Sequence, residues 1–340
     1  MNRGNAGSKA FVDPALFDMA VPHARKGILV SREPTISDQH KDVPTRQTIA
    51  DRAKETLADL LGHPLAAGLY LVATPIGNLG DITLRALSVL ARSDIVYCED
   101  TRHSAKLLNH YGIAAKTLPF HEHNEDREIE RVLAQVESGK RVAIISDAGT
   151  PLLSDPGFRL VRAAAARDVS LTSIPGPSAA LTALTTSGLP TDAFFFAGFL
   201  PPKQGARRTR LGELAQVPGS LVLFEAPHRV SEALADMADV LGDRPAVIAR
   251  ELTKLHESFA RGTLASLTKS IANDTLKGEI VIVVGAPLAE AVSDEMIDAR
   301  LVEALGLMSL KDAAKTIAGE LGVPKARVYA LGVKAKDKSP

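Results

Sequence analysis

The densest group of polar side chains in the chain is the segment EDTRHS, which follows a short apolar run. Glu99 and Asp100 could accept a proton, and His103 carries the side chain that most often does so near neutral pH. Arg102 could orient a carboxylate or a phosphate. The same order of residues also suits the start of a helix, with Asp100 or Thr101 as its N-cap. The segment is therefore a candidate for proton transfer, and a solvent-exposed helix start is the alternative.

Four loops with unusual turn residues also follow apolar runs. They are ATPIGNLGDIT (73–83), SDAGTPLLSDPG (146–157), SIPGPSAALTAL (173–184) and LFEAPHR (223–229). Their glycines and prolines fix the backbone and allow a ligand to approach its amides and carbonyls closely. No loop has a basic side chain inside its turn to hold a phosphate. A cationic or zwitterionic ligand therefore fits better than a nucleoside triphosphate, and S-adenosylmethionine is such a ligand. Tight strand–helix turns are the alternative, with Asp147 and Asp155 as helix caps.

Two further polar segments could bind a metal or a nucleic acid. FHEHNEDRE (120–128) brings two histidines and several carboxylates together, but histidines two apart on an irregular loop are weak metal ligands, and we expect no metal. KQGARRTR is the one strongly basic segment of the two main domains. Its Lys203, Arg207 and Arg208 could bind RNA phosphates, although they would also suit the exposed face of a helix.

The composition limits the classes of protein to which the chain can belong. Its 340 residues include 40 basic and 40 acidic side chains, so no overall field draws it toward nucleic acid or a membrane. The single cysteine, Cys98, excludes an intramolecular disulfide, a multi-cysteine zinc site and an iron–sulfur cluster held by cysteines of one chain. No apolar run approaches the roughly 18 residues that span a bilayer, and the start of the chain lacks a signal peptide's apolar stretch. We expect a cytoplasmic protein.

The elements that position the loops alternate along the chain. Short apolar runs, typical of buried strands, recur from position 69 onward. They are LYLVA (69–73), DIVYC (94–98), RVAIIS (141–146), SLTSIP (170–175), AFFFAGF (193–199), SLVLFEAP (220–227), PAVIARELT (245–253) and GEIVIVVGAP (278–287). Segments with helical spacing separate them, and several end at a glycine. This alternation predicts an α/β fold with a largely parallel sheet, in which ligands bind at the carboxyl ends of the strands.

Breaks in composition divide the chain into four parts. Residues 1–66 are polar and irregular apart from the helical pattern of TRQTIADRAKETLADLLGH, and we expect a flexible extension. An N-terminal α/β domain follows over 67–200 and ends at a proline-rich, basic segment. A second α/β domain covers 201–290. The tail, 291–340, has two short helices around the sequence GVP, with the rhythm of a helix-turn-helix.

Eight segments, taken together and in order, resemble a known family. They are LVATPIGNLGDITLRAL, CEDTRHSAKLL, HEHNE, SDAGTPLLSDPG, IPGPSAALTAL, GLPTDAFFFAGFLP, FEAPHR and RELTKLHE. This series resembles the tetrapyrrole methylase superfamily, on the branch that methylates small-subunit ribosomal RNA. The resemblance implies two α/β/α domains with S-adenosylmethionine in the cleft between them, a helix-turn-helix-like C-terminal segment and a homodimer. It also implies the substrate, the ribose 2′-hydroxyl of one cytidine near the decoding centre of 16S rRNA in the small ribosomal subunit.

The resemblance assigns residues to cofactor binding by their place in the motifs. They are Pro75, Gly77 and Asn78 in the first loop, Ala148, Gly149, Thr150 and Leu153 in the second, Ser178 and Ala179 in the third, and Glu225 in the fourth. The catalytic candidates are Glu99, Asp100, Arg102 and His103. The RNA-contact candidates are Lys203, Arg207 and Arg208, with Lys325, Arg327 and Lys334 in the tail.

Two other functions remain open from the sequence. A methylase of the same superfamily could act on a tetrapyrrole, or on another small or protein acceptor. The EDTRHS and SDAGTPLLSDPG forms speak against it, because they look specific to the rRNA branch. A protein of a different class, a nucleic-acid-binding regulator built around the tail helices, would bind duplex DNA through residues 294–340.

Overall fold

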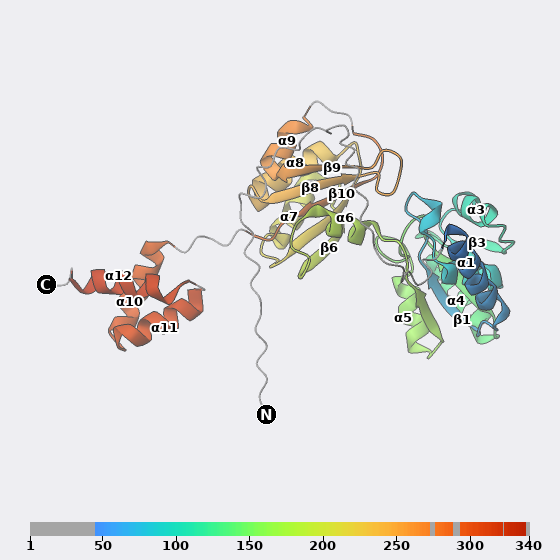
Figure 1. The fold of residues 1–340 in the computed structure, drawn as a ribbon, viewed down its shortest axis with the longest axis horizontal. Helices are drawn as coiled ribbons and strands as arrows, with labels where there is room; N and C mark the ends of the chain where they lie inside the picture. Colours follow the sequence, from blue (N-terminus) through green and yellow to red (C-terminus); the bar gives the residue numbers. More distant parts are fainter. Residues whose placement is uncertain (1–44, 273–275, 288–292, 322, 338–340) are drawn as a thin grey trace, which may run out of the picture. The chain divides into compact units, whose positions relative to one another are not determined.

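The computed structural model describes residues 45–272, 276–287, 293–321 and 323–337 (Figure 1). By their contacts the residues form two units, Met1–Ala286 and Pro287–Pro340. The first unit contains two five-stranded sheets, and the second is helical. Most of the polar extension expected over 1–66 lies outside the described residues.

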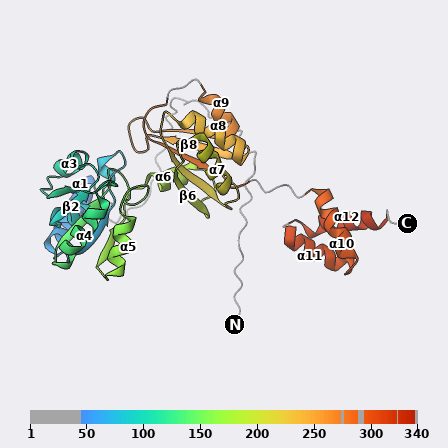
Figure 2. The ribbon, with the colours of Figure 1, turned by 180° about the vertical axis from the view of Figure 1, so that it is seen from behind.

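The first sheet is entirely parallel, as the alternation of strands and helices predicts. Its strands run in the order β3-β2-β4-β1-β5. They are β1 (Gly68–Val72), β2 (Ile95–Cys98), β3 (Thr117–Pro119), β4 (Arg141–Ile145) and β5 (Leu171–Ile174). The helices between them are α2 (Leu84–Arg92), α3 (Thr101–His110), α4 (Glu125–Glu137) and α5 (Phe158–Ala166), with α4 and α5 side by side (Figures 1 and 2).

Each face of this sheet has its own apolar core. Successive side chains of a strand point to opposite faces, so Tyr70 and Val72 pack with α2 and α3, whereas Leu69 packs with α4 and α5. The result is the α/β/α layering expected from the sequence. It leaves the carboxyl ends of the strands free to carry loops.

The second sheet is mixed rather than largely parallel. Its order is β6-β7-β10-β8-β9, and β6 and β7 are its parallel pair. The strands are β6 (Phe194–Phe199), β7 (Ser220–Glu225), β8 (Pro245–Arg250), β9 (Ser258–Thr263) and β10 (Ile280–Val284). Only seven residues, 251–257, join β8 to β9. That connection is too short for the crossover that parallel neighbours require, so the pair is antiparallel. The sequence interpretation missed β9, as it missed β3.

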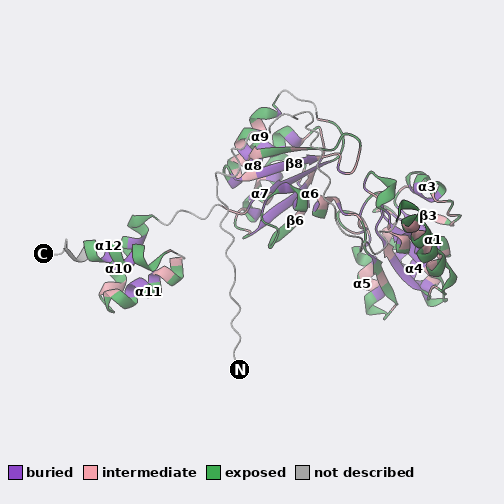
Figure 3. Cartoon of the chain, in the orientation of Figure 1, coloured by how far each residue is buried: buried purple, intermediate pink, exposed green. Residues whose placement is uncertain are grey.

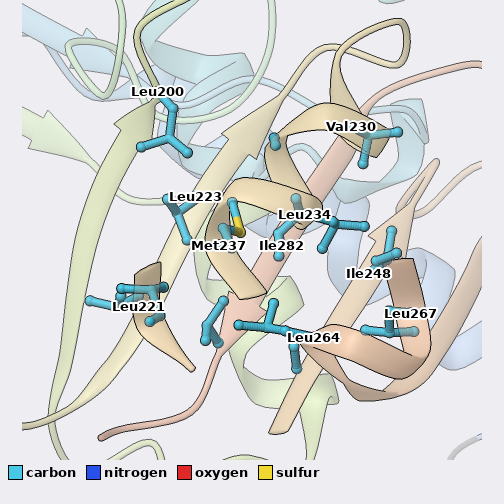
Figure 4. Close-up of a cluster of buried hydrophobic side chains, with 14 of the residues drawn as sticks. Leu200, Leu221, Leu223, Val230, Leu234, Met237, Ile248, Leu264, Leu267 and Ile282 are labelled. Atoms are coloured by element: carbon cyan, nitrogen blue, oxygen red, sulfur yellow. The ribbon is translucent and has the colours of Figure 1, made fainter. Parts of the chain in front are cut away.

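Helices cover both faces of the second sheet, whose inner strands β7, β10 and β8 are largely buried (Figure 3). On one face lie α7 (Gln204–Leu214), α8 (Val230–Leu241) and α9 (Leu264–Ser270). Their apolar side chains, among them Leu234, Met237 and Leu264, pack against Leu223, Ile248 and Ile282 of the strands (Figure 4). On the other face, α6 (Ala179–Ser187) packs against β10, β7 and β8.

The pairing of β6 changes the predicted boundary at 200/201. The run 193–199 was assigned to the first domain, but its strand pairs with β7, and the preceding helix α6 packs on the second sheet as well. An apolar run indicates a strand without indicating its neighbour, which is why the sequence placed this boundary too late. The change of sheet occurs between β5 and α6.

Helix α1 (Arg46–Gly62) confirms the helical pattern at the end of the polar extension. Leu57 contacts the core beneath α2, and the Ser88 hydroxyl donates a hydrogen bond of 3.1 Å to the Leu60 carbonyl. This part of the extension therefore packs on the first α/β layer.

The described residues of the C-terminal unit form three helices. They are α10 (Asp294–Leu305), α11 (Leu310–Leu321) and α12 (Lys325–Asp337), the last two matching the helices expected around GVP. Ile297, Leu301, Ile317 and Val328 are buried at the centre of the unit. Because the three helices bury apolar side chains together, they form a small core of their own.

Candidate functional site

A cavity of about 410 Å³ lies within the first unit, at the carboxyl ends of strands from both sheets. Residues after β1, β4 and β5 line it together with the ends of β6 and β7 and the beginning of β10. The lining consists of Ile76, Asp147, Ala148, Gly149, Thr150, Leu153, Ser154, Asp155, Ser178, Ala179, Phe199, Phe224, Glu225, Ala226, Pro227, Gly278, Glu279, Ile280 and Val281. Seven of the ten predicted cofactor residues are in this set: Ala148, Gly149, Thr150, Leu153, Ser178, Ala179 and Glu225.

Hydrogen bonds join the first three loops beside the cavity. Thr74 and Gly149 exchange both backbone bonds, with N–O distances of 2.9 and 3.0 Å. Gly149 has a φ of +79°, a conformation that glycine adopts without strain. The Thr150 hydroxyl donates to the Pro177 carbonyl at 3.2 Å, and Ser178 caps α6 by accepting from the Leu181 amide. The loops that the sequence singled out are therefore fixed to one another.

Glu225, in the fourth loop, contributes a buried carboxylate to the cavity lining. Its Oε1 accepts hydrogen bonds from the Ala226 amide at 2.8 Å and pairs with the Arg229 guanidinium at 2.7 Å. Its Oε2 is also buried, and it has no hydrogen-bond partner among the described residues. A buried carboxylate oxygen without a donor is costly, so this oxygen is a place for a ligand to donate a hydrogen bond.

Pro75, Gly77 and Asn78 do not line the cavity, whereas Ile76 between them does. The Asn78 side chain caps the short 3-10 helix η2 (Leu79–Asp81) by accepting from the Gly80 amide at 3.0 Å. A Cβ at Gly77 would overlap Cγ of Lys254. These residues shape the first loop and permit its close contact with the loop after β8.

The acidic part of the EDTRHS segment lies next to the second loop. The Asp100 amide donates to Oδ1 of Asp147 at 3.2 Å, and the Asp100 carboxylate caps α3 by accepting from the Arg102 amide at 2.8 Å. Glu99 shares a small cavity with Ser146 and Asp155. The helix-start interpretation is thus confirmed for Asp100, and the segment also borders the cavity loops.

The other two catalytic candidates point to solvent. The Arg102 and His103 side chains are exposed at the start of α3, and the Arg102 guanidinium pairs with the Asp100 carboxylate at 3.5 Å. They are accessible to an acceptor molecule but make no contact with the cavity lining.

Two carboxyl groups beside the cavity have raised pKa values. For Asp155 burial is the main cause, followed by the negative charges of Glu99 and Asp147, and together they raise its pKa to about 6. Burial, then Asp147 and Glu122, raise the pKa of Glu99. Hydrogen bonds from the Arg102 amide and side chain lower the pKa of Asp100. A carboxyl group that titrates near neutral pH is suited to proton transfer.

Several lining residues were missed as site residues in the sequence interpretation. Asp155 was considered as a helix cap, but α5 begins after Gly157, and the Asp155 side chain makes no cap hydrogen bond. Residues 278–281 were missed because ligand sites were expected only at carboxyl ends of strands. β10 is antiparallel to β7, so its first residues lie beside Glu225 at the carboxyl end of β7.

The structure corrects Arg207 as an RNA-contact candidate. Its side chain is 1% exposed, and Nε donates to Oδ2 of Asp236 at 2.7 Å. Arg208 is partly exposed but bonds to Asp236 and Asp239. Lys203, at the N-cap of α7, is exposed. A buried guanidinium that is neutralised by a buried carboxylate cannot reach an RNA phosphate, whereas Lys203 can.

In the C-terminal unit, the three basic candidates differ. Lys325 and Lys334 are exposed, whereas the Arg327 guanidinium pairs with Asp294 at 2.6 Å. The two lysines are therefore the stronger candidates for contact with an anionic partner.

The described residues contain neither a metal-ion cluster nor a membrane-spanning helix. Within them, no group of three or more His, Cys, Asp or Glu side chains is arranged to hold a metal ion. Across the same part of the chain, no helix has the length and apolar character that crossing a membrane requires.

Family models match both units of the chain. The model described as Tetrapyrrole (Corrin/Porphyrin) Methylases matches residues 68–268, which contain the first sheet and every strand of the second except β10. The model described as RsmI C-terminal HTH domain matches residues 290–336, which contain α10 and α11 and most of α12.

Curated relatives match over most of their length. The ribosomal RNA small subunit methyltransferase I of Mesorhizobium japonicum is 50% identical over 283 residues, which are 83% of this chain and 96% of that protein. The protein of the same name from Pseudomonas aeruginosa is 45% identical over 281 residues, 81% of this chain and 99% of the relative.

Solved structures share the fold at low sequence identity. Diphthine synthase matches with a TM-score of 0.51 and 17% identity, over 64% of this chain and 89% of that one. The cobalt precorrin-4 methyltransferase CbiF matches with a TM-score of 0.50 and 18% identity, over 64% of this chain and 94% of that one.

Proposed function

The chain belongs to the ribosomal RNA small subunit methyltransferase I family of the tetrapyrrole methylases, and from this membership we propose its reaction. It transfers the methyl group of S-adenosylmethionine to the ribose 2′-hydroxyl of a cytidine in the decoding region of small-subunit rRNA. The observation that carries the proposal is the cavity where the four loops meet, lined by carboxylates and apolar side chains. We also propose a cytoplasmic location, because the proposed substrate is the small ribosomal subunit.

The cavity fits S-adenosylmethionine in charge and in hydrogen bonding. Among the described residues that line it there are four carboxylates and no lysine or arginine, which suits a cationic ligand. Oε2 of Glu225 lacks a donor, and Ile76, Phe224 and Val281 supply apolar walls. We propose that Ala148, Gly149, Thr150, Leu153, Ser178, Ala179 and Glu225 hold the cofactor. When bound, it supplies an electrophilic methyl group on a sulfonium.

Positioning carries most of the proposed catalysis. Holding two reactants in the right geometry can supply about 7–11 kcal/mol of the barrier reduction, whereas a general base typically adds about 10²–10⁴-fold. The loops that define the cavity are bonded to one another, which supports a rigid site. Of the predicted catalytic group, Glu99 is the best placed to take the proton of the 2′-hydroxyl, because its pKa is raised and it borders the second loop.

The remaining catalytic candidates position other groups or contact the RNA. Asp100 fixes the start of α3 and, through its amide, the Asp147 carboxylate. Arg102 and His103 are exposed at the same helix end and can contact the RNA around the acceptor nucleotide. Exposed Lys203, Lys325 and Lys334 supply further contacts to phosphates. Arg208 contributes less, because two carboxylates already bind it.

We also propose a homodimer. β6 is an edge strand of the second sheet, and its Phe194 and Phe195 are 44% and 39% exposed. An exposed edge with aromatic side chains is a surface that proteins usually cover. Sedimentation equilibrium of the intact protein and of Phe194→Glu tests this. A dimer that Phe194→Glu dissociates supports the proposal, and a monomeric wild-type protein contradicts it.

Transfer of labelled methyl from S-adenosylmethionine tests the function. The acceptors are assembled small ribosomal subunits from cells lacking this methylation, protein-free small-subunit rRNA and a tetrapyrrole precursor. We expect label in the assembled subunit and none in the tetrapyrrole. The variant Ala179→Phe, which fills the cavity, abolishes transfer, whereas Ala58→Phe on the exposed face of α1 retains it. Label in the tetrapyrrole, or activity that survives Ala179→Phe, contradicts the proposal.

A further inference from the structure

The carboxylates that line the cavity differ in how far the protein compensates their charge. Glu225 pairs with Arg229 at 2.7 Å, and Glu279 lies 3.3 Å from the ammonium of Lys254. Asp147 accepts a hydrogen bond from the Asp100 amide. Asp155, by contrast, forms no ion pair with any described residue; its polar neighbour is the Ser146 hydroxyl. It is the carboxylate of the lining with the least compensation from the protein.

The backbone around Asp155 is held in an unfavourable conformation. Leu152 and Ser154, both non-glycine residues, have φ values of +74° and +68°. Such residues typically cost about 1–3 kcal/mol each and persist where the surrounding structure imposes them. Gly198 of β6 permits the close approach of this turn, because a Cβ there would lie 3.0 Å from Oγ of Ser154. Asp155, which directly follows Ser154 in this turn, is half-buried and lines the cavity.

Asp155 lies between the cavity proposed for the cofactor and the proposed base, Glu99. Its side chain borders both the main cavity and the small cavity that contains Glu99 and Ser146. With Glu99 as the proposed base, the acceptor would approach from the Glu99 side. A bound S-adenosylmethionine whose methyl group faces that side would have its sulfonium beside Asp155.

We propose that Asp155 is the residue by which this site distinguishes S-adenosylmethionine, with its sulfonium, from the uncharged thioether S-adenosylhomocysteine. This specificity role rests on the proposed function. The carboxylate attracts the sulfonium of the cofactor. Once the methyl has been transferred, the sulfur is neutral and that attraction is lost, so the product binds more weakly than the substrate.

Titration of Asp155 makes the role measurable. In the protein without ligand, burial raises the pKa of Asp155 most. The negative charges of Glu99, which follows β2, and Asp147, which follows β4, raise it further, to about 6. An opposite charge within about 4–6 Å lowers a carboxyl pKa by about one to three pH units. Binding the sulfonium therefore releases protons near pH 6, and binding the thioether does not. Two further charged groups, Glu122 and His121, act on Glu99: Glu122 raises its pKa and His121 lowers it.

Isothermal titration calorimetry with both ligands, at pH 5 to 8 and in two buffers of different ionisation enthalpy, tests the proposal. For the wild type we expect proton release with S-adenosylmethionine near pH 6, and a preference over S-adenosylhomocysteine that increases with pH. Asp155→Asn should abolish the release and reduce the preference about tenfold. The control, Asp59→Asn on the exposed face of α1, makes the same chemical change and should behave as the wild type.

A second variant keeps the carboxylate in place. Glu99→Gln removes the largest charge effect on Asp155, so the proton release should move to lower pH. Release and preference that persist unchanged in Asp155→Asn, or a profile that Glu99→Gln leaves unmoved, would overturn the role of Asp155. If neither the wild type nor the control binds S-adenosylmethionine, the proposed function fails, and this inference with it.

Discussion

Replacing Arg207 with alanine removes the buried guanidinium that faces Asp236. The two side chains are 1% and 3% exposed, and their Nε–Oδ2 distance is 2.7 Å. After the replacement, Asp236 keeps hydrogen bonds only from Arg208 at 3.1 Å and Gln204 at 3.2 Å. Removing one partner of a buried pair typically costs about 3–5 kcal/mol. Because Arg208 still compensates part of the charge, we expect a loss of about 3 kcal/mol in the free energy of unfolding.

The loss should depend on pH in a defined direction. Burial would raise the pKa of Asp236, but hydrogen bonds from Arg207, Arg208 and Gln204 outweigh it and lower the pKa below its ordinary value. A lowered pKa stabilises the folded state above the unfolded-state pKa of about 3.9, and this stabilisation is lost as the pH falls below it. The difference between wild type and Arg207→Ala should therefore be full at pH 7 and smaller at pH 3.

Urea unfolding followed by circular dichroism measures this difference. Lys203→Ala, four residues away and exposed, is the matched control and should change stability by less than about 0.5 kcal/mol. Replacing both partners, Arg207→Met with Asp236→Leu, should recover most of the loss, because no buried charge is left from the pair. If Arg207→Ala is as stable as Lys203→Ala but binds small subunits more weakly, the assignment of Arg207 to the core is refuted.

Three further substitutions test the site and its surroundings. The pKa of Asp155 is raised to about 6, so the folded state loses stability as the pH rises through that value. At pH 8, Asp155→Asn should therefore be more stable than the wild type by about 1–2 kcal/mol, after allowance for solvent screening. Near pH 4 the two proteins should be equally stable. Urea unfolding at both values checks this, and a difference independent of pH contradicts it. Gly77→Ala forces a Cβ against Lys254, so it should lower the free energy of unfolding by about 1–3 kcal/mol and weaken cofactor binding in calorimetry. Gly62→Ala, which has open space around it, is the control and should have neither effect. Lys203→Glu should weaken binding to small subunits in filter assays and reduce the salt dependence of that binding. The cofactor Kd should not change. An unchanged affinity for subunits would exclude an RNA contact at Lys203.

The parts of the fold that depend on local sequence were predictable. The strands of the first sheet other than β3, and the helices between them, follow from short apolar runs, helical spacing and terminal caps such as Thr83 and Asp100. In a parallel α/β sheet those patterns also indicate where the ligand loops lie. The cavity accordingly contains residues from all four loops that the sequence singled out.

The parts that depend on pairing over long sequence distances were not predictable in the same way. Nothing local in the run 193–199 indicates that β6 pairs with β7 rather than with the first sheet. Arg207 and Asp236 are 29 residues apart, so a basic run that looked suited to RNA contains a buried ion pair. The raised pKa of Asp155, likewise, depends on burial and on Glu99, which is 56 residues away in the sequence, as well as on Asp147 of the same loop.

We propose that a cofactor bound in the cavity donates its methyl group to one ribose of the small-subunit rRNA. The most direct test is to methylate small subunits from cells lacking this modification with the purified protein and S-adenosylmethionine, and then to map the product by mass spectrometry of rRNA fragments. We expect one added methyl, on the ribose of a single cytidine in the decoding region. A methyl group on a base, or on a nucleotide elsewhere in the subunit, would contradict it.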